Sequence, residues 1–276
     1  MARVRFRVAV WLMAAGSLVM GGCSSDPTTP EAKLARGKEI IRKMSARLAG
    51  ASAMSVTSEQ VRERVRRNGE KEAKTVSHEL LMRRPDRVWF KATGDEQDRE
   101  GWYNGKEFTL VGHRDKVFAR APMPETIDRA IDVVSERYGI IVPMGDLIYS
   151  SPEKALIGPK TTGGWAGRED VDGVSCDHLA FQDVGADWQI WIPASGDPLP
   201  KRLQMTFKKR RGEPTTRIAF KEWNLAPQVA DAAFAKEVPA GYEGIAMIQR
   251  ASILVNMPES PPEEAAPPGA AQGTKQ

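Results

Sequence analysis

Runs of alternating apolar and polar residues, broken by two-residue turns, constrain the fold of this chain more than any other feature. Two long alternating arms flank Asn68-Gly69, a dipeptide typical of tight β-hairpin turns. On the first arm Val61 and Val65 share one face, and Arg62 and Arg64 share the other. Because side chains alternate across a strand, this pattern predicts a long antiparallel hairpin.

The same signal recurs along the chain. Shorter alternating segments turn at Asn104-Gly105 and at Asp172-Gly173, and residues 187–207 form two further arms around a Gly- and Pro-rich turn. We therefore expect about ten or eleven strands, most of them joined by short hairpins. Such connections predict an antiparallel sheet.

Segments with helical spacing interrupt the strands. Apolar residues recur every three or four positions in residues 30–50 and again in residues 124–139. Gly139 stands where a left-handed residue commonly ends a helix, and a shorter helical piece is expected around Leu147 and Ile148. The predicted fold class is α+β, with two or three helices packed on one face of the sheet.

The N-terminus resembles a bacterial lipoprotein signal. Three arginines precede the apolar run 8–20, which is shorter than the about 20 residues that span a bilayer. Met20-Gly21-Gly22-Cys23 then resembles the lipobox, with Met where Leu is usual. The resemblance implies cleavage before Cys23, acylation of Cys23 and, with Ser24 next to it, sorting to the outer membrane. The alternative is ordinary secretion with an incidental cysteine.

Removing residues 1–22 changes the charge balance. The chain has 40 Lys and Arg and 36 Asp and Glu, and the signal holds three Arg and no acid, so the mature net charge is (40 − 3) − 36 = +1. A near-neutral chain gives no electrostatic case for binding nucleic acid. With Cys23 acylated, Cys176 is the last thiol and an intramolecular disulfide is excluded.

The chain ends differ in composition from the middle. We expect a signal peptide over 1–22, a tether over 23–30, one domain over 31–256 and a disordered Pro- and Ala-rich tail over 257–276.

Residues with catalytic chemistry are scattered. His78, His113 and His178 lack the spacing of metal ligands. The segment 175–179, "SCDHL", contains Ser, Cys, Asp and His, but on a strand Cys176 and His178 would face away from the other three. We therefore expect no metal, no cofactor and no enzyme activity. The basic run 208–212, "KKRRG", is either a contact for anionic lipid head groups or a plain solvated turn.

Several segments together resemble one known family. "RRPDRVWFKATGD", "WYNGKEFTLV", "RYGIIVPMGDLI", "WQIWIPASGDPLPKRLQMTF" and the closing "NLAPQVADAAFAKEVPAGYE" resemble DUF2092, a family of predicted periplasmic proteins. That family looks like part of the lipoprotein-carrier (LolA-like) superfamily. The resemblance implies a curved antiparallel half-barrel whose concave face is covered by helices over an apolar cavity.

The hairpin 187–207 contributes most to the predicted ligand site. Its inward face is expected to carry apolar side chains from both arms, and Trp191 is expected on the outer face, at a rim or partner surface. The sequence leaves open whether the inward residues form solid core or a cavity wall. The full set of predicted cavity-lining residues is Val88, Phe90, Leu110, Ile127, Ile131, Val134, Trp188, Ile190, Ile192, Leu203, Met205 and Phe207.

Two functions follow from this resemblance. The first is a non-enzymatic, membrane-anchored periplasmic lipoprotein that binds a lipid, an acyl chain or a lipoprotein in the half-barrel. The second is a periplasmic sensor or scaffold that binds a protein partner in envelope-stress signalling.

Overall fold

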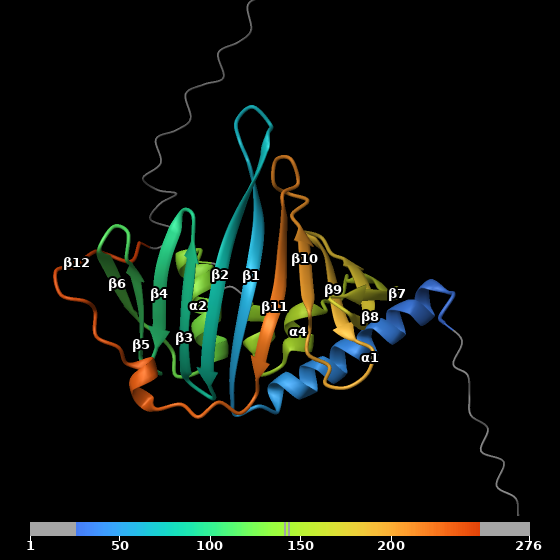
Figure 1. The fold of residues 1–276 in the computed structure, drawn as a ribbon, viewed down its shortest axis with the longest axis horizontal. Helices are drawn as coiled ribbons and strands as arrows, with labels where there is room; N and C mark the ends of the chain where they lie inside the picture. Colours follow the sequence, from blue (N-terminus) through green and yellow to red (C-terminus); the bar gives the residue numbers. More distant parts are fainter. Residues whose placement is uncertain (1–25, 141, 143, 249–276) are drawn as a thin grey trace, which may run out of the picture.

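The computed structural model describes residues 26–140, 142 and 144–248 (Figure 1). The predicted signal peptide, Cys23 and the predicted tail 257–276 lie outside the described residues. Within the described part, the chain is one large curved sheet with helices packed on one face of it, which confirms the α+β prediction.

The sheet has twelve strands in the described residues, in the spatial order β12-β6-β5-β4-β3-β2-β1-β11-β10-β9-β8-β7. All neighbouring pairs are antiparallel except β12 with β6. The strands are β1 (Ala53–Val65), β2 (Lys71–Arg83), β3 (Arg87–Gly94), β4 (Gln97–Tyr103), β5 (Glu107–Gly112), β6 (Val117–Pro122), β7 (Thr162–Val171), β8 (Val174–Gln182), β9 (Asp187–Pro193), β10 (Arg202–Thr206), β11 (Thr215–Asn224) and β12 (Glu243–Gly244).

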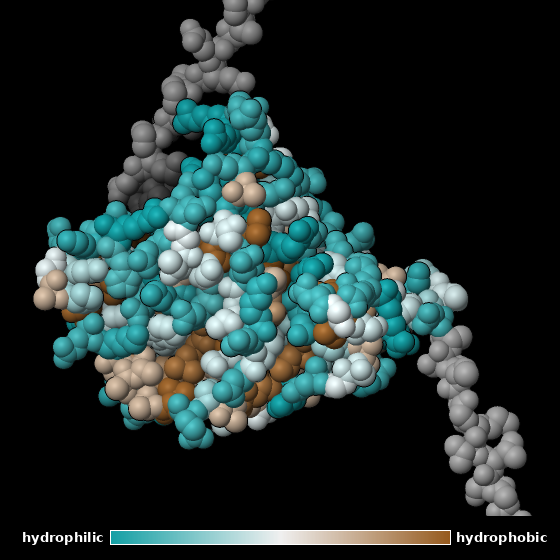
Figure 2. Space-filling view, viewed as in Figure 1, coloured by the Kyte–Doolittle hydropathy of each residue, from teal (hydrophilic) through white to brown (hydrophobic). Residues whose placement is uncertain are grey.

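The predicted hairpin turns are present. Gly69, Gly105 and Gly173 all have φ near +80° to +90°, the left-handed region that glycine enters without steric cost. The β1–β2 hairpin around Gly69 is the longest, and it projects beyond the ends of its neighbours (Figure 1). This projecting end is hydrophilic, and hydrophobic side chains gather towards the opposite end of the same face (Figure 2).

Helix α1 (Pro30–Ala49) begins at a capped end and lies against strand β7. The Thr29 side chain accepts a hydrogen bond from the Ala32 backbone nitrogen at 3.2 Å, which satisfies a free N–H at the helix start. Gly37 of α1 meets Gly164 of β7, and a Cβ on Gly37 would lie 2.9 Å from the Gly164 Cα. Two glycines therefore allow the helix backbone to approach the strand backbone closely.

The other helices cover the opposite half of the concave face and the middle. Helix α2 (Ile127–Tyr138) starts at Thr126 and ends at Gly139, whose φ of 66° is the left-handed cap predicted from the sequence. Two short helices follow, α3 (Gly145–Ile148) and α4 (Pro152–Leu156). Buried residues of α1, α2 and α3 form one hydrophobic core with the inward side chains of the sheet.

The C-terminal segment runs back past the ends of the strands (Figure 1). After β11 it runs along the lower edge in Figure 1, through the 3-10 helix η1 (Asp231–Phe234), to β12 at the far edge. Phe234 is fully buried beneath the Arg83 guanidinium, and the Lys236 ammonium lies 4.5 Å from the centre of the Trp89 ring. Strand β12 has two residues and no alternating pattern, which is why the predicted count of ten or eleven strands fell short.

Candidate ligand-binding cavity

A cavity of about 350 Å³ lies on the concave face of the sheet, beside the loop that follows α2. Its size falls within the range of about 300–1,000 Å³ that is usual for small-molecule sites. Strands β1 to β5, β10 and β11 contribute most of its wall, and the residues after α2 close one side. The lining residues are Gln60, Arg62, His78, Phe90, Ala92, Gln97, Arg99, Phe108, Leu110, Gly139, Ile140, Val142, Met205, Phe207, Arg210 and Thr216.

The strand register explains how these residues meet. Phe90 of β3 is paired with Gly101 of β4, which is paired with Leu110 of β5, so all three positions share the concave face. The Phe90 and Phe108 rings stack with centroids 6.3 Å apart. A Cβ on Gly101 would lie 2.5 Å from the Phe90 ring, so this glycine leaves room for the aromatic floor of the cavity.

A smaller apolar space adjoins this floor beneath α2. Its volume is about 30 Å³, and it shares Phe90, Phe108 and Val142 with the larger cavity. Its remaining wall comes from β3, β4, α2 and α3, through Val88, Tyr103, Ile127, Ala130, Ile131, Val134 and Ile148. The apolar floor therefore continues between the sheet and helix α2.

One wall of the cavity carries a buried histidine. His78 of β2 is 4 % exposed, and its Nε2 lies 2.8 Å from Oε1 of Gln60. Burial lowers the pKa of His78 to about 4, and the positive charge of Arg62 adds to this effect. His78 is therefore neutral at physiological pH, and the cationic groups of the cavity are arginines.

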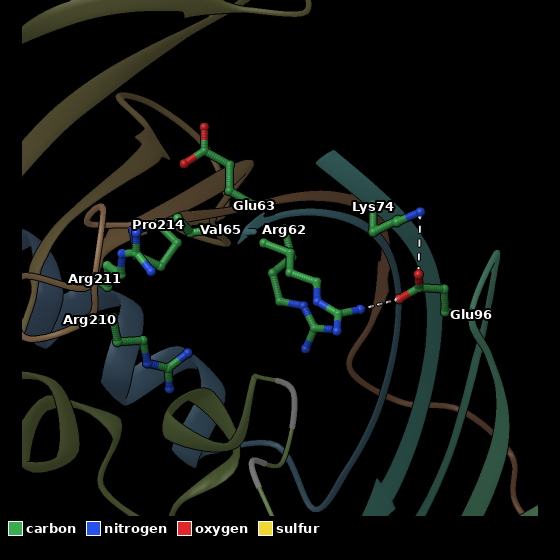
Figure 3. A pocket seen from close by; sticks show the side chains of 9 residues that line it. Arg62, Glu63, Val65, Lys74, Glu96, Arg210, Arg211 and Pro214 are labelled. Atoms are coloured by element: carbon green, nitrogen blue, oxygen red, sulfur yellow. Dashed lines mark ion pairs between the residues drawn. The ribbon is translucent and has the colours of Figure 1, made fainter. Parts of the chain in front are cut away.

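The mouth of the cavity is basic. Arg62 and Arg210 line both the cavity and a second opening of about 370 Å³, and Arg62 and Arg99 line both the cavity and a third opening of about 280 Å³. The second opening is lined by nine residues, five of them basic: Arg62, Glu63, Arg64, Val65, Lys74, Glu96, Arg210, Arg211 and Pro214. Figure 3 shows Arg62 and Arg210 projecting into this opening, with the Glu96 carboxylate at its far side. Glu96 is paired with Lys74 at 3.3 Å and with Arg64 at 3.7 Å.

The structure divides the predicted cavity-lining residues into three groups. Phe90, Leu110, Met205 and Phe207 line the larger cavity, and Val88, Ile127, Ile131 and Val134 line the smaller space. The third group lines neither and belongs to the packed core: Trp188, Ile190, Ile192 and Leu203.

The third group explains the hairpin 187–207. Ile190 and Ile192 are fully buried, and Trp188 stacks on Phe181 of β8 with ring centroids 4.4 Å apart. The same core includes Ile41 and Met44 of α1. This half of the concave face is therefore filled with side chains, and the cavity opens in the other half.

Trp191 faces outwards as the strand alternation predicted, but it does not form an open rim. It is 6 % exposed, because His178 stacks on it with ring centroids 4.4 Å apart and the Arg202 guanidinium lies 5.5 Å from its centre. Its Nε1 donates to Oε2 of Glu169 at 2.8 Å. The expected role as a partner surface is therefore wrong, and Trp191 forms a small outer core with Val171 and Cys176.

The polar members of the cavity were not predicted as site residues. Gln60, Arg62 and His78 fall at inward positions of the β1–β2 hairpin, where Arg62 is paired with Lys74. The alternation of arginines with valines on the first arm was visible in the sequence. It did not reveal that the arginine side, rather than the valine side, continues the concave face.

The residues of the "SCDHL" segment are divided between the two faces of β8. Asp177 accepts a hydrogen bond from Nε1 of Trp165 at 2.8 Å and lies 3.6 Å from Arg36 of α1. Cys176 and His178 lie on the opposite face, beside Trp191, and burial raises the pKa of the Cys176 thiol. Asp177 therefore serves the contact between α1 and the sheet.

The described residues hold neither a cluster of metal-binding side chains nor a helix suited to crossing a membrane. In residues 26–140, 142 and 144–248, no group of three or more His, Cys, Asp or Glu side chains is placed to hold a metal ion. In the same residues, none of the helices combines the length and the apolar character needed to cross a membrane.

The chain matches one known protein family over most of its length. The model of a family described as "Predicted periplasmic protein (DUF2092)" matches residues 37–248. The chain belongs to the DUF2092 family. No curated protein matches this DUF2092 chain.

Solved structures with a similar arrangement share little sequence with it. An uncharacterized conserved protein from Thermus thermophilus is 10 % identical, with 76 % of this chain and 98 % of that chain covered and a TM-score of 0.46. The Mycobacterium tuberculosis lipoprotein LppX is 14 % identical, with 70 % and 97 % covered and a TM-score of 0.43. A LolA superfamily protein from Nitrosomonas europaea is 9 % identical, with 73 % and 98 % covered and a TM-score of 0.37. All three are distant likenesses.

Proposed function

We propose that this DUF2092 protein is a non-enzymatic, lipid-anchored periplasmic protein that holds the acyl chain of a lipid or lipoprotein in its concave cavity. The main support for this proposal is the cavity of about 350 Å³, with an aromatic floor and a basic mouth, on the half of the sheet that the core leaves open. Binding would transfer apolar surface out of water at about 25 cal/mol per Å², and no bond would be made or broken.

The amphipathic lining supports this proposal. Phe90, Phe108, Leu110 and Met205 offer an apolar surface, and Arg62, Arg99 and Arg210 line the openings of the cavity. A wholly polar ligand would lose hydrogen bonds to water against the apolar floor, which offers none in return. A wholly apolar ligand would bury the arginines without partners. A molecule with one apolar and one polar end matches both parts.

The proposed anchor is Cys23, acylated after removal of residues 1–22, and the proposed location is the outer membrane. Several acyl chains would hold the protein far more firmly than one chain does. An anchor at the N-terminus would keep the cavity close to the membrane from which a lipid is taken or to which it is delivered.

The second candidate is a scaffold or sensor that binds a protein partner. Beside β12, Ile245 is 48 % exposed and Ile248 is 60 % exposed, and β7 forms the opposite edge of the sheet. An open sheet edge offers unpaired backbone groups to another chain. This candidate needs no cavity ligand.

Native mass spectrometry of the protein purified from membranes separates the two candidates. The lipid-binding proposal predicts a bound mass that organic extraction removes, together with uptake of a fluorescent fatty acid by the extracted protein. An empty protein that takes up no amphiphile would exclude lipid binding and favour the scaffold.

A further inference from the structure

We propose that the ligand of the cavity is a lipid with an anionic head group, which Arg62, Arg99 and Arg210 bind at the mouth. This inference rests on the proposed function and specifies its ligand class. It is carried by the charge balance of the cavity, which is distinct from its size.

The three arginines come from separate parts of the fold and line the same cavity. Arg62 lies on β1, Arg99 lies on β4 and Arg210 lies in the turn between β10 and β11. Strand alternation aims the first two at the concave face, since Arg62 is paired with Lys74 and Arg99 is paired with Ala92, another lining residue. The fold therefore gathers three positive charges around one cavity.

Three neighbouring cations have acidic partners, but Arg62, Arg99 and Arg210 do not, and Arg211 donates only to the Arg67 backbone oxygen. Lys74 and Arg64 both pair with Glu96, and Arg66 pairs with Glu72. Among the described residues no carboxylate lies within 4 Å of Arg62, Arg99 or Arg210, and no acidic residue lines the cavity.

Arg210 is held at the mouth by an aromatic ring. Its guanidinium lies 4.3 Å from the centre of the Phe207 ring, and both residues line the cavity. Phe207 thus connects the cationic mouth to the apolar floor that continues through Met205. This contact orients the guanidinium without neutralising it.

A ligand anion at this mouth would supply the negative charge that the protein does not place beside these arginines. Guanidinium groups bind phosphate and carboxylate through paired N–H donors, and such charge-assisted bonds are stronger than neutral ones. His78 cannot contribute a charge, because burial keeps it neutral at physiological pH. The apolar floor beside the arginines fixes the direction of the ligand, with its chain inwards and its anion at the mouth.

The test compares two lipids with the same acyl chain. Lysophosphatidic acid carries a phosphate monoester on glycerol, and the matching monoacylglycerol carries none. We expect the full-length protein to bind the phosphate lipid about tenfold or more tightly, since hydrogen bonds to charged groups are worth more than neutral ones. Raising the salt concentration should reduce this preference.

The variant combines Arg62→Gln, Arg99→Gln and Arg210→Gln, which removes charge and keeps polar side chains. The matched control combines Arg129→Gln, Arg217→Gln and Lys221→Gln, which removes three charges outside the cavity. The cavity variant should lose the preference for the phosphate lipid and keep its affinity for monoacylglycerol, and the control variant should retain both.

Each other outcome contradicts a defined part of this account. Equal binding of both lipids by the wild type, or a preserved preference in the cavity variant, would overturn the anionic head group and leave the cavity proposal standing. Binding of inorganic phosphate as tightly as lysophosphatidic acid would show that the acyl chain adds nothing, which would indicate a free-anion site and overturn the lipid as its source. If neither lipid binds, the proposed function itself fails.

Discussion

The Phe90 ring occupies the space that a side chain at Gly101 would need, because a Cβ there would lie 2.5 Å from two of its ring carbons. Phe90 and Gly101 are paired on adjacent strands, and Phe90 lines the cavity. The absence of a side chain at Gly101 therefore lets the Phe90 ring lie back from the open volume.

The substitution Gly101→Ala should push the Phe90 ring into the cavity. We expect a loss of about 1–3 kcal/mol in the free energy of unfolding, typical of overpacking, and weaker uptake of a fluorescent fatty acid. Gly112→Ala on β5 is the matched control, because its Cβ would meet Val117 at an ordinary 3.4 Å. Equal effects of the two substitutions would show that the Gly101 contact is not critical.

The buried His78 predicts a dependence of stability on pH. Its pKa is lowered from 6.5 to about 4 by burial and by Arg62, so between these values the unfolded chain binds more protons than the folded chain. Stability should therefore fall as the pH drops from 6.5 towards 4, by about 3 kcal/mol in total from this residue. Urea unfolding at several pH values gives the free energy of unfolding of wild type and of His78→Gln. Between pH 6.5 and 4 this free energy should fall less steeply with decreasing pH in the variant. An identical pH dependence in both proteins would contradict the lowered pKa.

The close approach of α1 to β7 depends on Gly164. A Cβ at this position would lie 2.3 Å from the Lys33 backbone oxygen, and the residue has φ of +139°. Gly164→Ala should lower the free energy of unfolding by about 3 kcal/mol or more, because backbone cannot move aside easily.

Gly167→Ala separates the two causes of the loss expected for Gly164→Ala, which are the clash of the added Cβ and the strain of a positive φ. Gly167 lies on the same strand with φ of +145°, but no atom lies within 4 Å of its added Cβ. It therefore carries the backbone strain without the clash, and it should cost clearly less in the same urea unfolding measurement. A control loss as large as that of Gly164→Ala would assign the whole effect to strain.

The proposed anchor predicts a simple biochemical result. Cys23→Ala should abolish incorporation of labelled palmitate and leave unprocessed precursor, because the acylated sulfur is absent. Cys176→Ala should label like wild type, since Cys176 is buried in the small outer core. Labelling of the Cys23 variant at the normal level would show that the lipoprotein assignment is wrong.

Much of the fold could be predicted from the sequence because its signals are local. The Asn-Gly and Asp-Gly turns require left-handed residues, and Gly139 ends α2 in the predicted conformation. Strand β12 could not be found in this way, because its two residues are ordered by pairing with Val117 and Phe118 far back in the chain.

The candidate site was less predictable, because an empty volume leaves no periodic pattern. Ile190 and Met205 fall on the same face of neighbouring strands, yet Ile190 is fully buried in the core and the cavity opens beside Met205. Strand alternation fixes the face of a side chain but not whether other side chains fill the space above it. The basic mouth depends similarly on strands β1 and β4, which are separated in the sheet by two others.

The central claim is that the concave face holds an amphiphile where Met205 lies and not where Ile190 lies. Enlarging each to Trp tests this most directly, with thermal stability and uptake of a fluorescent fatty acid measured on both variants and on wild type. Met205→Trp should remain as stable as wild type and lose uptake, and Ile190→Trp should lose about 1–3 kcal/mol by overpacking a filled core. Undiminished uptake by a stable Met205→Trp protein, or no uptake by wild type, would contradict the account.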